Sequence, residues 1–294
     1  MTRLASIDGQ LFAPEQAKVS IYDRGFLYGD SVFETIRTYR GLPFSLGEHL
    51  ERLERSAERV LIAMPVSKEK IAEEIRAAVA AAGNPESYIR AMLTRGSGPL
   101  GLDPAQAEHP LRVIFIEPLN PLPASMYQQG VSVVCVRTKR SADAAQGAKV
   151  GNYLESLLAL SVAKKAGAHE ALIVDAGAHV VEGTTSNVFA FCAGTLLTPG
   201  EEAGILPGIT RAHILQAAER LGIALQFETL SPQTLAAADE VFLSSSIREI
   251  LPVVRIDEHQ VGDGQPGRLT RRLHAEFRRH AGLSDLPMPW EESK

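Results

Sequence analysis

The sequence predicts a protein of the mixed α/β (α+β) class with two domains. Its 294 residues suffice for about two domains of ordinary size, and the balance of 45% apolar and 22% charged residues is typical of a globular chain. Segments with strand and helix patterns alternate. Residues 118–125 contain three prolines, which disfavour helices and central strands. We therefore predict a smaller N-terminal α/β domain over residues 1–117, a proline-rich linker over 118–128 and a larger domain over 129–294.

The N-terminal part is predicted to contain strands and helices in alternation. In a strand over residues 31–39, Phe33, Thr35, Arg37 and Tyr39 share one face, because successive side chains point to opposite sides. Apolar residues at helical spacing predict the helices of this part. The other predicted elements are helices over 46–61 and 67–83 and strands over 88–94 and 111–116.

The C-terminal part carries clear signals for helix ends. Asn152 and Glu155 are spaced as an N-terminal capping pair, Gly167 would end that helix, and Ser231-Pro232 is a cap followed by proline at the first helical position. The predicted elements are strands over 131–136, 171–174, 187–191, 195–197 and 240–243, and helices over 153–166, over 210–221 and from residue 231 onward.

Charge and cysteine usage exclude several classes of function. A net charge of −5 gives no reason to expect nucleic acid or an anionic membrane as a partner. The basic cluster over residues 271–280 is predicted to be a solvated helix face. Cys135 and Cys192 are isolated, as in a reducing compartment, and no histidine or cysteine has metal-ligand spacing. With no apolar run of 18 residues and no hydrophobic leader at the N-terminus, we expect a cytoplasmic protein without a metal.

Gly96, Gly98 and Gly101 form a G-x-G-x-x-G pattern directly after a predicted strand. A dinucleotide site would need a helix to begin inside that pattern, so that its N-terminus faces the pyrophosphate. Here the chain leads to another strand instead. We therefore interpret the glycines as a loop and not as a nicotinamide or flavin site.

The stretch from Lys149 to Thr210 carries the chemistry. Lys149 lies in a small-residue loop before a helix, and a lysine there can form a Schiff base and shuttle a proton. Glu182 precedes a turn rich in hydroxyl and amide groups, and Thr210 opens a helix; such donors suit a phosphate dianion. A carboxylate nearby can keep a pyridine nitrogen protonated. Together these features match the requirements of pyridoxal 5'-phosphate (PLP).

The same segments resemble the class IV (fold-type IV) PLP-dependent aminotransferases. This family includes branched-chain amino acid aminotransferases, D-amino-acid aminotransferases and aminodeoxychorismate lyases. The resemblance covers roughly residues 20–255. It rests on Asp23–Gly25 with Tyr28–Glu34, on His49 with Arg52, on Lys149–Leu154, on Glu182 with Asn187–Phe189, on Leu196–Thr198, on Leu206–Arg211 and on Ser244–Ser246 with Glu249–Ile250. It implies a two-domain fold like that of D-amino-acid aminotransferase, with PLP bound by the larger domain.

The resemblance also implies roles for individual residues. Lys149 would be the catalytic residue that forms the Schiff base, Glu182 would pair with the pyridine nitrogen, and Arg52 would bind the phosphate with support from His49. Ile209 and Thr210 would add donors from their helix N-terminus. The cofactor-binding residues expected from the resemblance are Arg52, Lys149, Tyr153, Glu182, Thr185, Ser186, Asn187, Leu206, Gly208, Ile209, Thr210, Ser245 and Ser246.

Two signals disagree about the reaction. Tyr88 and Arg90 share a strand face and resemble the pair that holds carboxylates in branched-chain aminotransferases, with Phe33 and Arg37 lining the same pocket. Thr35 instead resembles the lyases, since branched-chain enzymes usually have glycine there. The favoured reaction is transamination of hydrophobic or branched-chain L-amino acids with 2-oxoglutarate.

The alternatives are an aminodeoxychorismate lyase that releases pyruvate and 4-aminobenzoate and, less favoured, a D-amino-acid or (R)-amine transaminase. The last is disfavoured because the loop Leu100–Leu102 lacks the Arg/His pair of the D-specific enzymes. By analogy with the family, we expect small amino and keto acids as substrates and a homodimer or higher homo-oligomer.

Overall fold

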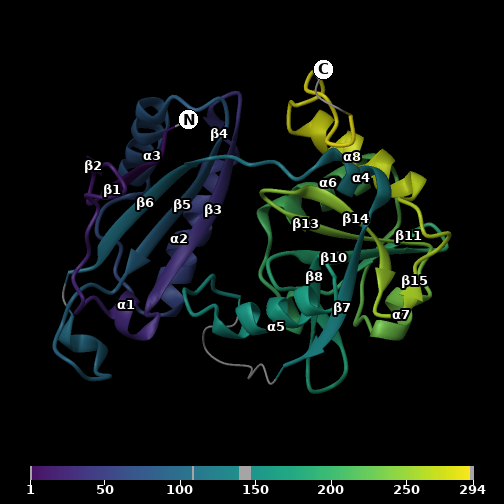
Figure 1. Ribbon diagram of the computed structural model, residues 1–294, viewed down its shortest axis with the longest axis horizontal. Coiled ribbons are helices and arrows are strands. Elements are labelled where there is room, and N and C mark those ends of the chain that lie inside the picture. Colours follow the sequence, from purple (N-terminus) through teal and green to yellow (C-terminus); the bar gives the residue numbers. More distant parts are fainter. Residues whose placement is uncertain (1, 108, 139–146, 292–294) are drawn as a thin grey trace. The chain divides into compact units, whose positions relative to one another are not determined.

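The computed structural model describes residues 2–107, 109–138 and 147–291, which form two compact units (Figure 1). Unit 1 contains the described residues up to Asn120 together with the segment that ends at Tyr153. Unit 2 begins at Pro121 and resumes at Leu154. Each unit contains one β-sheet with helices packed on it, so the predicted mixed α/β class is confirmed.

Unit 1 is built on a six-stranded sheet in the order β2-β1-β6-β5-β3-β4, and every pair of neighbours is antiparallel. Its strands are β1 (Leu4–Ile7), β2 (Gln10–Phe12), β3 (Ser31–Tyr39), β4 (Leu42–Pro43), β5 (Ser87–Thr94) and β6 (Leu111–Pro118). Its helices are α1 (Arg24–Tyr28), α2 (Leu46–Arg59) and α3 (Lys68–Ala82), with a 3₁₀ turn at Pro104–Gln106.

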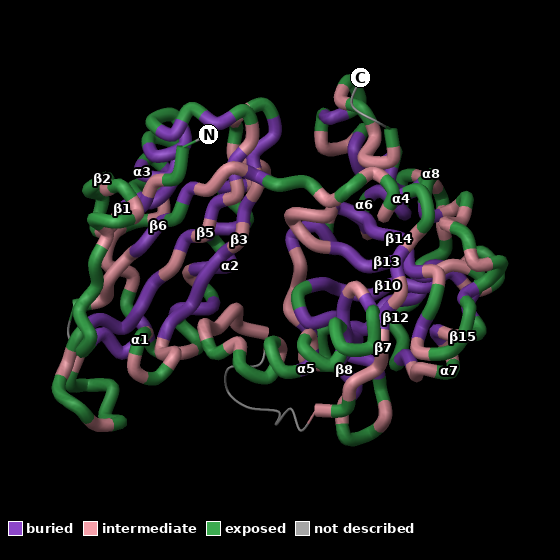
Figure 2. Tube along the Cα trace, in the orientation of Figure 1, coloured by how far each residue is buried: buried purple, intermediate pink, exposed green. Residues whose placement is uncertain are grey.

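The core of unit 1 lies between one face of this sheet and helices α2 and α3 (Figure 2). Leu46, Leu50, Leu53 and Ala57 form an apolar stripe at helical spacing on α2, and all four are buried. Full burial of one such leucine contributes about 2 kcal/mol. The side chain of Ser67 caps the first turn of α3 by accepting from the Lys70 backbone N–H.

Unit 2 contains a nine-stranded sheet in the order β12-β11-β10-β13-β14-β7-β8-β9, with β15 beside β14. Its strands are β7 (Val131–Arg137), β8 (Glu170–Val174), β9 (Val180–Gly183), β10 (Asn187–Cys192), β11 (Thr195–Thr198), β12 (Leu225–Phe227), β13 (Glu240–Ser245), β14 (Glu249–Ile256) and β15 (His259–Gln260). The helices of unit 2 are α4 (Ala124–Gln129), α5 (Leu154–Lys165), α6 (Ile209–Arg220), α7 (Pro232–Ala236) and α8 (Arg268–His280), with a 3₁₀ turn at Glu201–Ala203.

Both faces of the second sheet are covered. On one face Val188, Ala190, Leu243 and Leu251 belong to a buried cluster that includes Leu235 of α7. On the other face α6 and α8 pack over β13. The rings of Phe189 and Phe242 stack there at a centroid distance of 4.8 Å. A sheet covered on both sides needs apolar residues at successive positions, as in the fully buried run from Asn187 to Phe191.

Two findings modify the predicted elements, and a third agrees with the sequence. Helix α4 begins within the stretch predicted to be a linker and ends one residue beyond it, and the three prolines precede its first residue. Arg278 belongs to the cluster predicted to be solvated, yet it is buried and pairs with Glu249, Nε to Oε2 at 2.7 Å. Among the described residues, no helix is long and apolar enough to cross a membrane.

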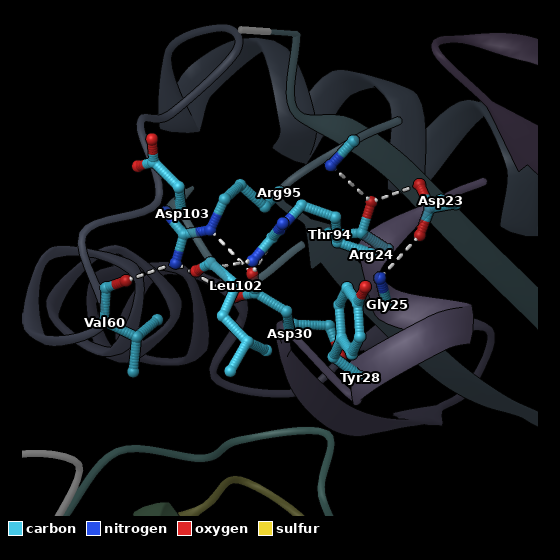
Figure 3. Close-up of polar contacts among 12 residues, drawn as sticks. Asp23, Arg24, Gly25, Tyr28, Asp30, Val60, Thr94, Arg95, Leu102 and Asp103 are labelled. Carbon is cyan, nitrogen blue, oxygen red and sulfur yellow. Dashed lines mark hydrogen bonds and ion pairs between the residues drawn. The ribbon is translucent and has the colours of Figure 1, made fainter. Parts of the chain in front are cut away.

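The G-x-G-x-x-G loop is fixed by a polar network in unit 1 (Figure 3). Asp30 accepts hydrogen bonds from Arg24 Nε at 3.0 Å and from Arg95 Nε at 2.7 Å. Arg95 also donates to the carbonyls of Val60 and Leu61 at the end of α2, and Arg24 donates to that of Gly101. In the described part of this loop no α-helix begins, as the sequence predicts.

Gly96 is required at its position in this loop. Its φ of +91° favours glycine, and an added Cβ would lie 1.9 Å from the carbonyl oxygen of His109. We expect Gly96→Ala to lower the free energy of unfolding by at least about 2 kcal/mol in urea denaturation. Gly47→Ala is the matched control, because nothing lies within 4 Å of its added Cβ and alanine favours helices. Equal stability of the two variants would contradict this account of the loop.

Candidate active site

The backbone of Lys149 is held against strand β3. Val150 forms a bridge with Val32, the Phe33 N–H donates to the Lys149 carbonyl at 3.0 Å, and the Gly151 N–H donates to the Ser31 carbonyl at 2.7 Å. The Lys149 N–H donates to Ser56 Oγ of α2 at 3.2 Å. Strand β3 and helix α2 therefore fix the direction in which the side chain of Lys149 leaves the backbone.

The amino group of Lys149 lies among aromatic rings. Nζ donates to Tyr153 Oη at 3.2 Å and lies 4.7 Å from the centre of the Phe33 ring. The Phe33 and Tyr153 rings meet edge to face at 5.2 Å. In the part of the chain that the structure describes, no carboxylate forms an ion pair with this lysine. An amine in such surroundings is available to bond to an aldehyde.

Arg52 is fixed by a buried carboxylate. Glu34 of β3 accepts from Arg52 Nε and Nη2, both at 2.7 Å, and Glu34 Oε2 lies 2.7 Å from Nδ1 of His49. His49 thus supports Arg52 through Glu34. Burial raises the pKa of Glu34, but the charge and hydrogen bonds of Arg52 and His49 outweigh it and lower that pKa to about 2. Burial lowers the pKa of His49, which favours the neutral ring.

The residues predicted to bind substrate share one face of the sheet in unit 1. Thr35 pairs with Arg90 and Arg37 with Tyr88 in the register of β3 and β5, and paired residues point to the same side. The Arg90 guanidinium lies 3.7 Å from the centre of the Phe33 ring, which also contacts Lys149. Arg37 stacks on Tyr39 at 4.0 Å. The structure therefore brings Phe33 and Arg90 together with Lys149 and places Thr35, Arg37 and Tyr88 on the same face of the sheet.

In unit 2, Glu182 and Asn187 hold the loop before α6. Glu182 Oε2 accepts from the Leu206 N–H at 3.0 Å, and Asn187 Nδ2 donates to the Leu206 carbonyl at 2.9 Å. An added Cβ on Gly208 would lie 2.1 Å from Asn187 Oδ1, so only glycine fits so close to this amide. The predicted residues Glu182, Asn187, Leu206 and Gly208 form one cluster.

The start of α6 suits a phosphate. Gly208 is its N-cap residue, so within the described chain no side chain caps the helix and the N–H groups of Ile209 and Thr210 lie at an open N-terminus. The buried Ser244 hydroxyl has no hydrogen-bond partner among the described residues, and Ser244 pairs with Asn187 across β10 and β13. Open amides, an unpartnered hydroxyl and the carboxylate of Glu182 form a donor and acceptor set that fits PLP.

The hydroxyls of Thr185 and Ser186 bind a protein carboxylate. Thr185 Oγ1 at 3.2 Å, Ser186 Oγ at 3.0 Å and the Thr185 N–H at 2.7 Å all donate to Oε1 of the buried Glu170. Arg248 pairs with the other oxygen of Glu170 and also donates to Thr185 Oγ1. These two hydroxyls therefore shape their turn through Glu170.

Ser245 and Ser246 lie where strand β13 ends and the following turn begins. Ser245 Oγ accepts from the Arg248 N–H at 3.4 Å, and the Tyr127 hydroxyl donates to the Arg248 carbonyl at 3.0 Å. Sequence reasoning missed Glu170 and Arg248 as parts of this region and treated Glu34 only as a motif residue. A buried acid on the apolar side of a predicted strand is the signal that could have found Glu34.

Among the described residues, no group of three or more His, Cys, Asp or Glu side chains could hold a metal ion.

The sequence profile of the family "Amino-transferase class IV" matches residues 31–256, and the chain belongs to this family. A relative from Methanocaldococcus jannaschii, named putative branched-chain-amino-acid aminotransferase, is 38% identical over 274 residues, which cover 92% of this chain and 94% of the relative.

Two solved structures share the fold over nearly the whole chain. The branched-chain amino acid aminotransferase of Escherichia coli has a TM-score of 0.90 and 32% identity, covering 99% of this chain and 98% of that chain. The 4-amino-4-deoxychorismate lyase of Pseudomonas aeruginosa has a TM-score of 0.82 and 34% identity, covering 96% of this chain and 99% of that chain. The predicted family, fold type and cofactor class are thereby confirmed, since enzymes of this family use PLP.

The buried pair of Glu34 and Arg52 predicts an acid-sensitive fold. The folded pKa of about 2 lies below the ordinary 4.5, so the pair stabilises fully above pH 4.5 and its contribution is lost as pH falls towards 2. We expect Glu34→Gln to lower the unfolding free energy at neutral pH and to flatten its pH dependence below about pH 5 in chemical denaturation. Glu58→Gln, at an exposed position on the helix that carries Arg52, is the control; an unchanged acid slope in Glu34→Gln would refute the assignment.

Proposed function

We propose that the enzyme transfers amino groups between hydrophobic or branched-chain L-amino acids and 2-oxoglutarate, with PLP as cofactor. The observation that carries this proposal is the Phe33 ring, which is contacted both by Lys149 and by Arg90. A cation that can receive a carboxylate thereby lies next to the reactive amine. The relative from M. jannaschii and the E. coli enzyme, both named for branched-chain amino acids, support the choice of substrate.

The cofactor-binding residues are proposed as follows. Lys149 bonds covalently to PLP, and Tyr153 orients its amine through the 3.2 Å hydrogen bond. Arg52 and the α6 amides of Ile209 and Thr210 bind the phosphate. Glu182, Thr185, Ser186, Asn187, Leu206, Gly208, Ser245 and Ser246 complete the proposed set, with Glu182 keeping the pyridine nitrogen protonated.

PLP supplies, when bound, an electron sink for negative charge that develops at the substrate Cα. Lys149 Nζ would remove the proton from that carbon and pass it on to the cofactor, which is general acid–base catalysis by an amine. Tyr88, Arg90 and Arg37 bind substrate carboxylates, and Phe33 with Thr35 borders the side-chain pocket. Burial of Phe33, which is 2% exposed, excludes water on that side of the amine.

A second candidate is the release of pyruvate and 4-aminobenzoate from aminodeoxychorismate. The observation in its favour is Thr35, whose branched side chain lies on the substrate face directly opposite Arg90. The Thr35 side chain occupies space on the substrate face that a glycine at position 35 would leave open. The structural likeness to the P. aeruginosa lyase also supports this alternative. Transamination of D-amino acids or (R)-amines is less favoured, because Leu100 and Leu102 supply no charge for a carboxylate.

A half-reaction distinguishes these activities. The PLP-loaded enzyme is mixed with L-leucine, D-alanine or (R)-phenylethylamine without a keto acid, and the absorbance of the bound cofactor is followed. We expect L-leucine alone to convert the cofactor to its pyridoxamine form. Conversion by D-alanine or the (R)-amine would contradict the proposed stereospecificity. No conversion by any of them would contradict transamination, and pyruvate release from aminodeoxychorismate would then establish the lyase.

The same assay tests Lys149. Lys149→Ala should lose this conversion by at least about a thousandfold, because the amine that moves the proton is gone. Its circular dichroism and thermal unfolding should match those of Lys165→Ala, which removes an exposed lysine from α5 and should keep full activity. Comparable activity of the two variants would sink the assignment of Lys149.

We further propose that the enzyme is a homodimer or a higher homo-oligomer. Helix α5 exposes an apolar stripe at helical spacing, formed by Leu154, Leu157, Leu158 and Val162, each at least 50% exposed. An exposed stripe of this kind is typical of an interface. Leu157→Glu should lower the mass measured by light scattering, whereas Arg255→Glu at an exposed position of strand β14 should not. A single-chain mass for the unmodified protein would refute the proposal.

A cytoplasmic location is also proposed. Cys135 and Cys192 are both free thiols, and burial, with Asp257 as a further cause, raises the pKa of Cys135 to about 12. Such thiols are unreactive small side chains and are typical of a reducing compartment. Recovery of the native protein in a periplasmic or secreted fraction would contradict this location.

A further inference from the structure

Two residues that the proposed chemistry does not use connect two turns of the cofactor-binding region. The first turn is Gly183–Ser186, and the second is Ser245–Arg248. Glu170, at the start of β8, lies under the first turn, and Arg248 ends the second. They are 78 residues apart in sequence, yet Arg248 Nη1 and Glu170 Oε2 form an ion pair.

The first turn is wrapped around the Glu170 carboxylate. Oε1 accepts from Thr184 Oγ1, from Thr185 through both its N–H and its hydroxyl, and from Ser186 Oγ. An added Cβ on Gly183 would lie 2.8 Å from the same oxygen. The turn therefore depends on an ionised acid beneath it. Burial raises the pKa of Glu170, but Arg248 and the Thr185 N–H outweigh burial and lower it.

Arg248 connects this carboxylate to the second turn. The Arg248 guanidinium donates to Glu170 through Nη1 and to Thr185 through Nη2. The Arg248 backbone N–H donates to Ser245 Oγ, and its carbonyl accepts from the Tyr127 hydroxyl. A planar guanidinium with two acceptors fixes distance and angle together, which a lysine cannot do. The arginine side chain is 17% exposed, whereas Glu170 is 1% exposed.

We propose that Glu170 and Arg248 are positioning residues that lock the turns Gly183–Ser186 and Ser245–Arg248 in the shape that binds the cofactor. This inference rests on the proposed function in one respect, namely that these turns bind PLP. Neither residue takes part in the chemistry; their ion pair preorganises donors contributed by their neighbours. Loss of Arg248 leaves Glu170 buried without its counter-charge and frees the second turn from the first.

The test measures cofactor affinity without covalent bonding. Pyridoxamine 5'-phosphate cannot bond to Lys149, so its dissociation constant from the apo-enzyme reports non-covalent contacts alone. We expect Arg248→Met to raise this constant by about 10-fold to 100-fold, the effect of losing hydrogen bonds that involve charged groups. Arg248→Lys should restore part of the affinity. Arg255→Met, which removes an exposed arginine from the same hairpin, is the control and should bind as the unmodified enzyme does.

A merely structural role predicts a different pattern. The unfolding temperature of Arg248→Met would then fall while its dissociation constant stayed within about twofold of the original, and this result would overturn the inference. If Arg248→Met does not fold, Glu170→Gln keeps the size of the buried side chain and removes the charge that pairs with Arg248; an unchanged constant there would also overturn it. An unmodified apo-enzyme that binds no pyridoxamine 5'-phosphate would instead refute the proposed function, so the two failures are distinguishable.

Discussion

The two-residue period of strand β3 is the constraint on which unit 1 depends. Val32, Glu34 and Ile36 point towards the helices, where the acid receives Arg52 and the aliphatic residues enter the core. Phe33 and its odd-numbered neighbours point to the opposite face, and the edge of the strand holds the backbone of Lys149. A shift of one residue would exchange the two sets of side chains, so the register that builds the core also arranges the amine, the aromatic rings and the arginines.

Buried acids fix the geometry in both units. The pairs are Glu34 with Arg52, Glu170 with Arg248 and Glu249 with Arg278. Removing charges from water costs several kcal/mol per ion, so such pairs add little net stability, but breaking one leaves an uncompensated charge. They therefore favour one arrangement over its alternatives. At Glu249 the fold also tolerates backbone strain, because a φ of +59° is unfavourable for a residue other than glycine.

The long elements and the kind of site were predictable from the sequence, whereas the contacts that support the site were not. Helix α2 and strand β3 carry clear periodic patterns of apolar residues, and the residues around Ile209 have a sequence pattern typical of the start of a helix. Strand β14 was missed because Pro252 interrupts its pattern, and α1 and β4 are too short for periodicity. The ion pair between Glu170 and Arg248 has no local signal, because it depends on how two hairpin turns meet in the folded sheet.

One face of β3 enters the hydrophobic core and the other carries the residues proposed to bind substrate, and this separation affects how the substrate preference of such an enzyme can change. Thr35 and Arg37, on the face of β3 that is proposed to bind substrate, are half-buried and carry no part of the hydrophobic core. Their neighbours one residue away are fully buried and tolerate little change in volume. Substrate preference can therefore drift through single substitutions at alternate positions while the scaffold stays constant, so closely similar chains can acquire different reactions without passing through an unfolded intermediate sequence.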